Sequence, residues 1–428
     1  MIVLVTDRIY VKTRRLLAKL VRAGDSAPIV LARVSGFPDG LPIDELRSLV
    51  SQTLDGSVEE IANQIGMVCG ARDLVRIVAL NESAILPALA LQRLLGLPER
   101  TGYLESCDKI QTRRLLGRSL TLAVATAWAH PGGIPHGAPF VASRYVVKPA
   151  FGMSSRDVKW ADTWEAAVAA AVMEPGQAWV PEHVARVLEI ERSDTRIIEE
   201  YIDGTEFSID GWIDGDRFQA IVQHKLAMVR TSFIGDGPTV SPPIGHCSDP
   251  RWSPLRTPER DVCQVGCEAL SLLGFKRGVF HIEGRERACD QSIQIVEINP
   301  RAPGGSLWRS AYLRTGLDLE LVDAQLQLGL PISTHDVISP PHVLHYPYYA
   351  FSVGVLKDWG DLAAELGRLP ADIRVDFAAT LGDRFTSADL TEEPYLAFAV
   401  GQASDQAKLL TLIDHLLKLK PPTVESLA

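Results

Sequence analysis

The sequence lacks the two glycine-rich motifs that mark common nucleotide sites. It contains neither G-x-G-x-x-G nor G-x-x-x-x-G-K-[ST], which disfavours a dinucleotide Rossmann site and a P-loop. No apolar run approaches the roughly 20 residues that span a bilayer. The N-terminus also lacks the basic segment and long apolar core of a secretory signal. We therefore expect no membrane partner and no secretion.

Cysteine is scarce and the net charge is negative. The six cysteines form no C-x-x-C pair, which disfavours a structural zinc site and fits a reducing, cytoplasmic setting. The net charge of −10 argues against a nucleic-acid partner. A polyanionic substrate such as ATP would need local cations and a metal ion.

Strands and helices alternate in the first hundred residues. This alternation predicts a parallel sheet with helices on both faces, in which ligands bind beyond the carboxyl ends of the strands. The expected strands are 2–5, 29–34 and 74–80, and the expected helices are 13–23, 58–68 and 83–95.

Hairpins replace this alternation further along the chain. Asp214-Gly215 is a turn signal between two apolar runs, and Asp290-Gln291 turns a strand at 279–283 into one at 293–297. After residue 330 the composition predicts a small antiparallel domain. The other expected elements are strands at 375–381 and 395–400, helices at 162–172, 261–273, 316–330 and 406–419, and loops at 96–106, 128–139 and 228–258.

The segment 294–309 carries the densest group of candidate functional residues. Glu297 and Asn299 lie two apart on an apolar strand, so their oxygens project from one face and suit Mg²⁺. Arg301 would share that face if the strand continued, and its guanidinium would bind developing phosphate charge. Gly304 and Gly305 would allow a ligand close to the backbone. Singly, each is more often a surface residue; the combination is specific.

Two carboxylates are predicted to face one another beside this segment. The hairpin places Glu283 and Glu297 on neighbouring strands, where opposite side chains lie only about 5 Å apart. Facing carboxylates repel unless a cation lies between them. This is the strongest physical argument in the sequence for a metal ion.

Lys109 is a candidate anion ligand. Asp108 is a plausible N-cap, which puts Lys109 in the first helical turn, where the helix dipole is already positive. A bound anion would offset that cost. The alternative is a solvated lysine.

Lys148 is a second candidate, because it ends a strand at 144–149 and precedes a loop of small residues at 150–156. The loop amides and the hydroxyls of Ser154 and Ser155 could wrap a phosphate. Glu199 and Glu200 are adjacent acids on a strand at 196–201. An adenine amino group and ribose hydroxyls would be suitable partners, and the alternative is an exposed strand edge.

The order of these residues resembles the ATP-grasp superfamily over residues 1–330. Within it, G-T-E-F-S-I-D-G, Q-H-K at 223–225 and N-P-R-A-P-G-G resemble the carboxylate–amine ligases, most nearly the L-amino-acid ligases that make dipeptides. The residues that carry the resemblance are Lys109, Lys148 with its loop, E199-x-x-I202-x-x-x-E206, Glu283 and E297-I-N-P-R301.

The resemblance implies an α/β ATP-grasp fold in four parts. These are an N-terminal parallel-sheet domain (1–107), a small lobe (108–205), a large lobe with the metal site (206–330) and a small C-terminal α+β domain (331–428). It also suggests a homodimer.

The resemblance implies roles for individual residues. Lys109 and Lys148 would contact the phosphates of ATP, as would Ser154 and Ser155 in the loop, and Glu206 would bind ribose. The other implied residues are Glu199, Glu200, Tyr201 and Ile202 for adenine, Glu283, Glu297 and Asn299 for one or two Mg²⁺ ions (or Mn²⁺), Arg301 and Lys225 for catalysis, and Gly304, Gly305, Ser306, Trp308 and Arg309, near Tyr312, for substrate.

The implied reaction joins a small carboxylate to a small amine, with amino acids as the expected substrates. ATP would activate the acid as an acyl phosphate, and the amine would displace phosphate to form an amide. Two alternatives stay open: a biotin-carboxylase-like enzyme that activates bicarbonate, and a nucleotide-binding regulatory protein without catalysis. The loop at 150–156 has one glycine where relatives often have several, which leaves its closure over phosphate in question.

Overall fold

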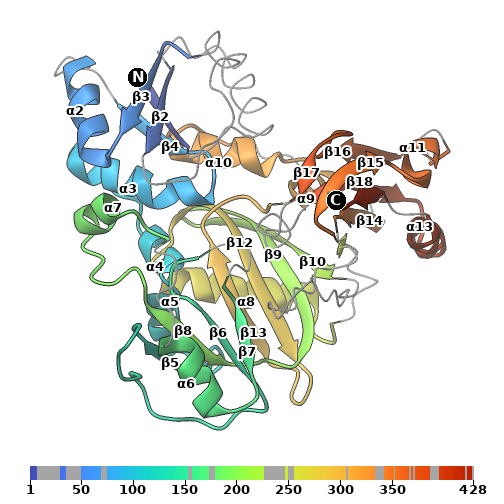
Figure 1. Cartoon of the computed structure of the whole chain (residues 1–428), viewed down its shortest axis with the longest axis horizontal. Helices are drawn as coiled ribbons and strands as arrows, with labels where there is room; N and C mark the ends of the chain where they lie inside the picture. Colours follow the sequence, from blue (N-terminus) through green and yellow to red (C-terminus); the bar gives the residue numbers. More distant parts are fainter. Residues whose placement is uncertain are drawn as a thin grey trace.

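The computed structural model arranges the strands of the described residues in four sheets (Figure 1). The described residues are 1–6, 29–34, 50–68, 75–152, 157–172, 179–225, 246–248, 255–304, 307–332, 342–350, 352–365, 368–369, 372–385, 395–419 and 422–426. Ser154, Ser155, Gly305, Ser306 and the helix expected at 13–23 lie outside these ranges. No helix in these ranges is long and apolar enough to cross a membrane.

The N-terminal part is the parallel sheet that the alternating pattern predicts. Its four strands run in the order β3-β2-β1-β4, and all three pairings are parallel. The unpredicted strand β3 is an edge strand with only Leu54 buried, so its sequence shows little apolar pattern. The elements are β1 (Ile2–Thr6), β2 (Ile29–Val34), β3 (Gln52–Gly56), α2 (Val58–Val68), β4 (Arg76–Ala79), the 3₁₀ turn η2 (Glu82–Ala84) and α3 (Ile85–Leu94).

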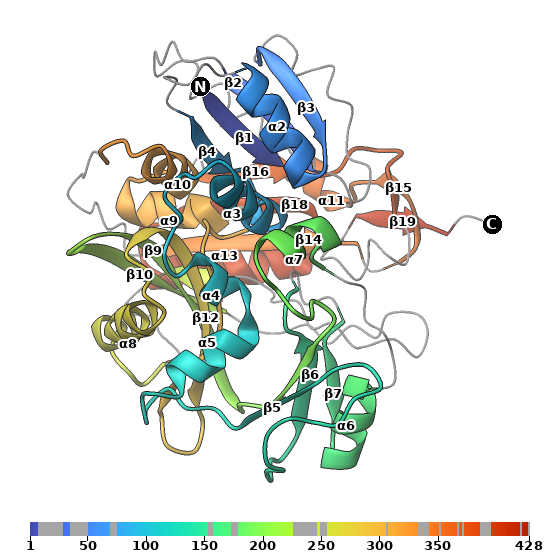
Figure 2. The same ribbon diagram turned by 90° about the vertical axis from the view of Figure 1, so that its left-hand side faces the viewer.

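The small lobe is an antiparallel sheet in the order β5-β8-β6-β7, with α6 packed against it (Figure 2). Two expected loops were wrong in part, because α4 occupies the end of 96–106 and β5 overlaps the start of 128–139. The elements of residues 103–200 are α4 (Tyr103–Cys107), α5 (Lys109–Leu116), β5 (Thr126–Ala129), β6 (Tyr145–Pro149), β7 (Lys159–Ala161), α6 (Trp164–Val172), α7 (Glu182–Val187) and β8 (Arg196–Glu200). Of these, α7 packs against α2 and α3 of the N-terminal part.

A sheet of eight strands forms the centre, in the order β13-β12-β9-β10-β11-β14-β18-β16. Alternate residues of its first strands build an apolar face against α8, with Phe207, Ile209 and Ile282 fully buried. The opposite face is polar at Ser208, Asp210, His281 and Glu283, and it is apolar where Trp212, Ile221 and Val279 pack against the helix at Leu319–Gln327. The elements are β9 (Gly204–Asp214), β10 (Arg217–Lys225), β11 (His246–Ser248), α8 (Glu259–Leu272), β12 (Arg277–Arg287), β13 (Ile293–Asn299), α9 (Leu307–Thr315) and α10 (Leu319–Gln327).

Two details of this part differ from expectation. β11 lies inside the segment 228–258 that was expected to be a loop. The helix expected at 316–330 begins later, because Gly316 has a φ of 69° and Asp318 caps α10 by accepting from the amide of Leu321 at 3.2 Å. The segment before it is α9, a helix that the sequence did not predict.

The C-terminal part continues the central sheet and adds a second one. β14, β18 and β16 extend the eight strands across residue 330, and β17-β15-β19 form a separate antiparallel sheet. Buried residues of β14, β18 and α13 share one apolar core. The elements are β14 (His342–Tyr349), β15 (Gly354–Asp358), α11 (Asp361–Glu365), β16 (Ile373–Phe377), β17 (Arg384–Phe385), β18 (Tyr395–Ala403), α13 (Gln406–Lys418) and β19 (Thr423–Glu425).

Candidate active site

Four side chains with oxygen or nitrogen atoms come together on one face of β12 and β13. The antiparallel register pairs Glu283 with Glu297 and His281 with Asn299. Paired side chains on one face of a sheet lie about 5 Å apart. The pairing of the two glutamates that the hairpin predicted is therefore confirmed.

The oxygens on this face fit a hard divalent cation. Glu283 and Glu297 supply carboxylates and Asn299 supplies an amide oxygen, which are the groups that Mg²⁺ accepts. In the described part of the chain, no group of three or more His, Cys, Asp or Glu side chains is placed to hold a metal ion. The amide of Asn299 would therefore have to be the third protein ligand.

Lys109 reaches this face from the first turn of α5. Its ammonium lies 3.1 Å from a carboxylate oxygen of Glu297 and donates to the carbonyl oxygen of Gly152 at 2.9 Å. Asp108 is the predicted N-cap, since its carboxylate accepts from the amides of Ile110 and Gln111. Burial lowers the pKa of Lys109, but Glu297 outweighs burial and raises it. Lys109 is thus held charged beside the carboxylates.

Glu283 is held by two cationic partners. The Nε2 atom of His281 lies 3.3 Å from Glu283, and the ammonium of Lys225 lies 3.8 Å away. Burial raises the pKa of Glu283, but Lys225 and His281 outweigh burial and hold it far below its ordinary value. Burial lowers the pKa of His281, but Asp210 and Glu283 raise it to about 9. The carboxylate of Glu283 is therefore ionised at neutral pH.

Arg301 was expected on the face of Glu297 and Asn299 if the strand continued, but the strand ends before it. β13 ends at Asn299, and the amide of Arg301 donates back to the carbonyl oxygen of Asn299 at 2.9 Å. Its guanidinium pairs with Glu82 of the N-terminal part at 2.5 Å and donates to the carbonyl oxygen of Ala302 at 2.9 Å. Arg301 therefore joins the end of β13 to the end of β4.

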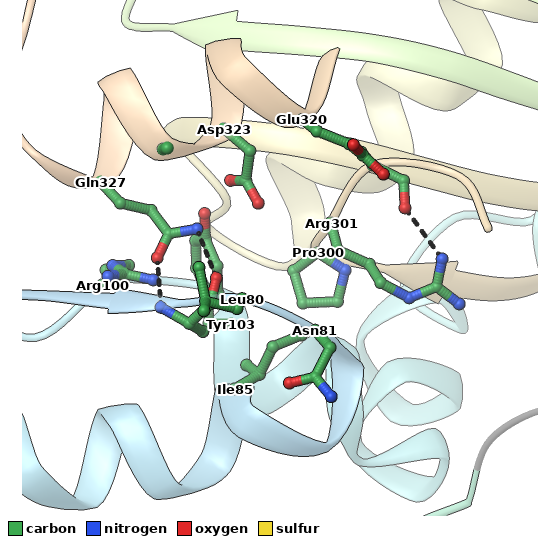
Figure 3. Close-up of a pocket in the computed structure, with 13 residues that line it drawn as sticks. Leu80, Asn81, Ile85, Arg100, Tyr103, Pro300, Arg301, Glu320, Asp323 and Gln327 are labelled. Atoms are coloured by element: carbon green, nitrogen blue, oxygen red, sulfur yellow. Dashed lines mark hydrogen bonds between the residues drawn. The ribbon is translucent and has the colours of Figure 1, made fainter. Parts of the chain in front are cut away.

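A small cavity lies behind this arginine (Figure 3). Asp323 and Gln327 of α10 point toward the end of β4. The side-chain oxygen of Gln327 accepts from the amide of Ala79 at 2.8 Å, and its side-chain nitrogen donates to the carbonyl oxygen of Ala79 at 3.3 Å. The cavity measures about 20 Å³, which is about the size of one water molecule. It is too small to take a substrate.

A buried ion cluster joins the two lobes. The ammonium of Lys148 lies 2.8 Å from Glu199, and Arg113 of α5 pairs with the other oxygen of the same carboxylate. Arg113 also donates to the carbonyl oxygens of Ile295 (2.5 Å) and Val296 (2.9 Å) on β13. Burial raises the pKa of Glu199, but Arg113 and Lys148 outweigh burial and lower it to about 2.

The segment after Glu199 is held by arginines of β12. Arg287 pairs with Glu200 at 3.0 Å. Arg285 donates to the hydroxyl of Tyr201 (2.9 Å) and the carbonyl oxygen of Ile202 (3.0 Å), and pairs with Glu206 at 2.6 Å.

Glu206 also pairs with Lys225 across β9 and β10. Glu200, Tyr201, Ile202 and Glu206 are thus held by side chains of β12 and β10.

Residues 141–309 match the family model of the ATP-grasp domain. The protein contains an ATP-grasp domain. The match spans both strands of the candidate metal site and Lys148, and stops within α9. No curated protein sequence matches the chain.

Solved structures with the ATP-grasp fold extend over the whole chain. An L-amino acid ligase from Bacillus licheniformis is similar with a TM-score of 0.71 and 16% identity, covering 100% of this chain and 98% of that chain. Phosphoribosylglycinamide synthetase from Anaerococcus prevotii has a TM-score of 0.61 and 11% identity, covering 99% of both chains. The biotin carboxylase domain dimer of 2-oxoglutarate carboxylase from Hydrogenobacter thermophilus, solved with MgADP and bicarbonate, has a TM-score of 0.60 and 13% identity, covering 99% of this chain and 91% of that chain.

These comparisons confirm the expected ATP-grasp fold with its N-terminal parallel sheet.

A second cavity, of about 50 Å³, lies where that sheet meets the ATP-grasp domain. Glu82, Lys109, Glu297, Asn299 and Gly152 are among the residues that line it. It therefore borders the candidate metal ligands directly.

The residues proposed for substrate recognition are divided by the structure. Gly304 does not need to be glycine for space, since a Cβ there would meet its nearest atom, on Arg301, at an ordinary 3.9 Å. Trp308 and Arg309 line a different cavity, of about 730 Å³, between α9, α10 and the end of the central sheet formed by β16 and β18. Arg309 lies over the ring of Trp308 and pairs with Asp376 of β16.

Several residues of this candidate site were missed in the sequence. Glu82 and Arg113 contact residues 219 and 86 positions away, so no local pattern marks them. A signal for β12 was available, because polar residues at every second position of a buried strand must share a face. The residues in this row are His281, Glu283, Arg285 and Arg287.

Proposed function

We propose that the protein is an ATP-dependent carboxylate–amine ligase that forms an amide or peptide bond, with release of ADP and phosphate. The observation that carries the proposal is the pair Glu283 and Glu297, facing one another on β12 and β13 with Asn299 beside them and Lys109 on Glu297. Binding a nucleotide does not by itself require such a set of ligands. The substrates would be a small carboxylate and a small amine, such as two amino acids.

The chemistry takes place in two balanced steps. An oxygen of the substrate carboxylate attacks the γ-phosphorus of ATP, the bond to the β-phosphate oxygen breaks, and acyl phosphate and ADP form. The amine nitrogen then attacks the acyl carbon, the bond to the phosphate oxygen breaks, and the amine loses a proton. Magnesium, held by Glu283, Glu297 and Asn299, would neutralise phosphate charge during transfer.

The chain's own cations supply the remaining charge. Lys109 and Lys148 would bind phosphate oxygens, and Glu199 keeps Lys148 oriented through their contact at 2.8 Å. Arg301 would stabilise the acyl phosphate, and Lys225 would approach the transferred phosphate or the substrate. Glu200, Tyr201 and Ile202 would hold adenine, with Glu206 on ribose. Trp308 and Arg309 would contribute to substrate choice through α9.

The proposal is tested by measuring ADP release from ATP with pooled amino acids, with and without Mg²⁺. We expect ADP only with both Mg²⁺ and a substrate, and an amide product by mass spectrometry. Release that depends on bicarbonate would instead favour a biotin-carboxylase-like reaction, which the similarity to a biotin carboxylase domain makes the second candidate. Nucleotide binding without any substrate-stimulated ADP would indicate a regulatory binder.

The proposed homodimer is tested separately. Sedimentation velocity would give about twice the mass of the chain if it forms.

A further inference from the structure

A network of hydrogen-bonded polar side chains, here called the polar network, crosses the central sheet behind Glu283. Asp210 of β9 accepts from the hydroxyl of Ser208 (2.8 Å) and the amide of Gln223 (2.7 Å), and its other oxygen lies 2.6 Å from Nδ1 of His281. The second ring nitrogen of His281 faces Glu283 at 3.3 Å. Asp210, Gln223 and Ser208 are each at most 1% exposed.

The polar network ends on a helix outside the candidate metal site. The hydroxyl of Ser310 on α9 bonds the side-chain oxygen of Gln223. Ser310 is buried, whereas Trp308 and Arg309 of the same helix line the cavity of about 730 Å³ beside β16 and β18. The polar network therefore connects the wall of that cavity to a carboxylate of the candidate metal site.

The register of the strands places the members of the polar network next to one another. Gln223 pairs with Ser208, Ser208 pairs with Glu283, and Asp210 pairs with His281. Each member is therefore directly opposite or diagonal to the next on one face of the sheet. Because every ring nitrogen of His281 has an acidic partner, the imidazole can turn only by breaking a short contact with Asp210 or the contact with Glu283.

We propose that His281, fixed by Asp210, is a positioning residue that orients Glu283 toward Glu297 for binding of magnesium. This inference rests on the proposed function, since it assigns a role toward the metal ion that the ligase reaction would use. Partners behind metal ligands fix ligand orientation, and their loss commonly costs about 10–100-fold in metal affinity. A role limited to satisfying buried polar groups would lower stability without changing the response to Mg²⁺.

The test is the Mg²⁺ dependence of ADP binding, measured by calorimetry on the full chain. We expect His281→Leu to raise the Mg²⁺ concentration for half-maximal enhancement about 10-fold or more, while ADP binding without Mg²⁺ stays within about twofold of wild type. His281→Gln, which keeps an amide donor near Glu283, should recover part of this loss. Gln219→Ala is the control, because Gln219 lies on the same strand as Gln223 and contacts Trp212 instead of the polar network.

Four results would overturn the proposal, and they have different meanings. An unchanged Mg²⁺ midpoint in His281→Leu, or equal losses with and without Mg²⁺, would leave His281 with a structural role only. If His281→Leu does not fold, Asp210→Asn is measured in its place, and an unchanged midpoint there counts equally against positioning. A wild-type protein whose ADP binding ignores Mg²⁺ would overturn the proposed function as well.

Discussion

Replacing Glu199 with glutamine is expected to destabilise the small lobe by about 3 kcal/mol at neutral pH. The carboxylate is 4% exposed and is shared by Arg113 and Lys148, both also buried. Removing one partner of a buried ion pair leaves the other charges uncompensated and typically costs about 3–5 kcal/mol. The pKa gives a similar figure, since lowering it from 4.5 to about 2 corresponds to about 3 kcal/mol of folding free energy.

The sign of the pH dependence follows from the lowered pKa. The folded protein binds the proton of Glu199 more weakly than the unfolded chain does, so the stabilisation is complete above the ordinary value of 4.5 and is lost as the pH falls toward 2. The difference in unfolding free energy between wild type and Glu199→Gln should therefore shrink between pH 5 and pH 3, by roughly 1–2 kcal/mol over that interval.

The assay is urea unfolding followed by tryptophan fluorescence, since Trp128 and Trp164 lie in the same lobe. Glu200→Gln is a matched control: the neighbouring acid pairs with Arg287 at 3.0 Å but is 21% exposed, so about 1 kcal/mol or less is expected. A loss below about 1 kcal/mol for Glu199→Gln, or a difference from wild type that does not change between pH 5 and pH 3, would refute the reasoning.

Three further predictions concern catalysis. Glu297→Gln should lower the rate of ADP release at least 100-fold while the far-ultraviolet circular dichroism stays that of wild type; retained activity would remove Glu297 from the metal site. Arg301→Lys should lower kcat about 10–100-fold, because an ammonium cannot reproduce the guanidinium fork, and Glu82→Gln should lower it less; equal kcat in all three proteins would exclude Arg301 from the reaction. Chelation of divalent ions should abolish turnover, and added Mg²⁺ or Mn²⁺ should restore it in a coupled ADP assay.

The parts of the fold that the sequence predicts are those with a strong local pattern. Apolar runs and turn signals located β1, β2, α2 and the hairpin of β12 and β13, including the pairing of Glu283 with Glu297. β3 was missed because a single buried side chain leaves little alternation. α9 was missed because the region after Arg301 was interpreted only as a source of substrate contacts, and no helix was predicted there. In each case the local pattern, not the element's importance, decided the outcome.

The site was predicted less completely, because its charges are paired across long distances in sequence. Glu297 and Asn299 could be recognised from spacing on one strand, but their partner Lys109 depends on where α5 packs. Arg301 was expected on the face of Glu297 if the strand continued, but β13 ends at Asn299 and the guanidinium pairs with Glu82. Tertiary packing therefore determines which acid each cation contacts, and spacing alone cannot supply that.

If the proposed metal site is correct, the lysines beside it predict that magnesium and nucleotide bind cooperatively. Lys109 contacts Glu297 at 3.1 Å, and Lys225 contacts Glu206 and lies 3.8 Å from Glu283. A cation entering between Glu283 and Glu297 would meet carboxylates already attracted to ammonium groups. Phosphate oxygens would offer these lysines another partner and leave the carboxylate oxygens to the metal ion. Because such coupling is reciprocal, nucleotide should strengthen Mg²⁺ binding by the same factor as Mg²⁺ strengthens nucleotide binding.

A coupling of about 10-fold or more is expected in wild type, within the usual range of 1–3 kcal/mol. Lys109→Met should bind Mg²⁺ alone at least as well as wild type, since the competing ammonium is gone, but should show weaker coupling to ADP. Titrating Mg²⁺ with and without saturating ADP measures both quantities in one experiment. Independent binding of the two ligands in wild type would show that the lysines do not exchange between carboxylate and phosphate.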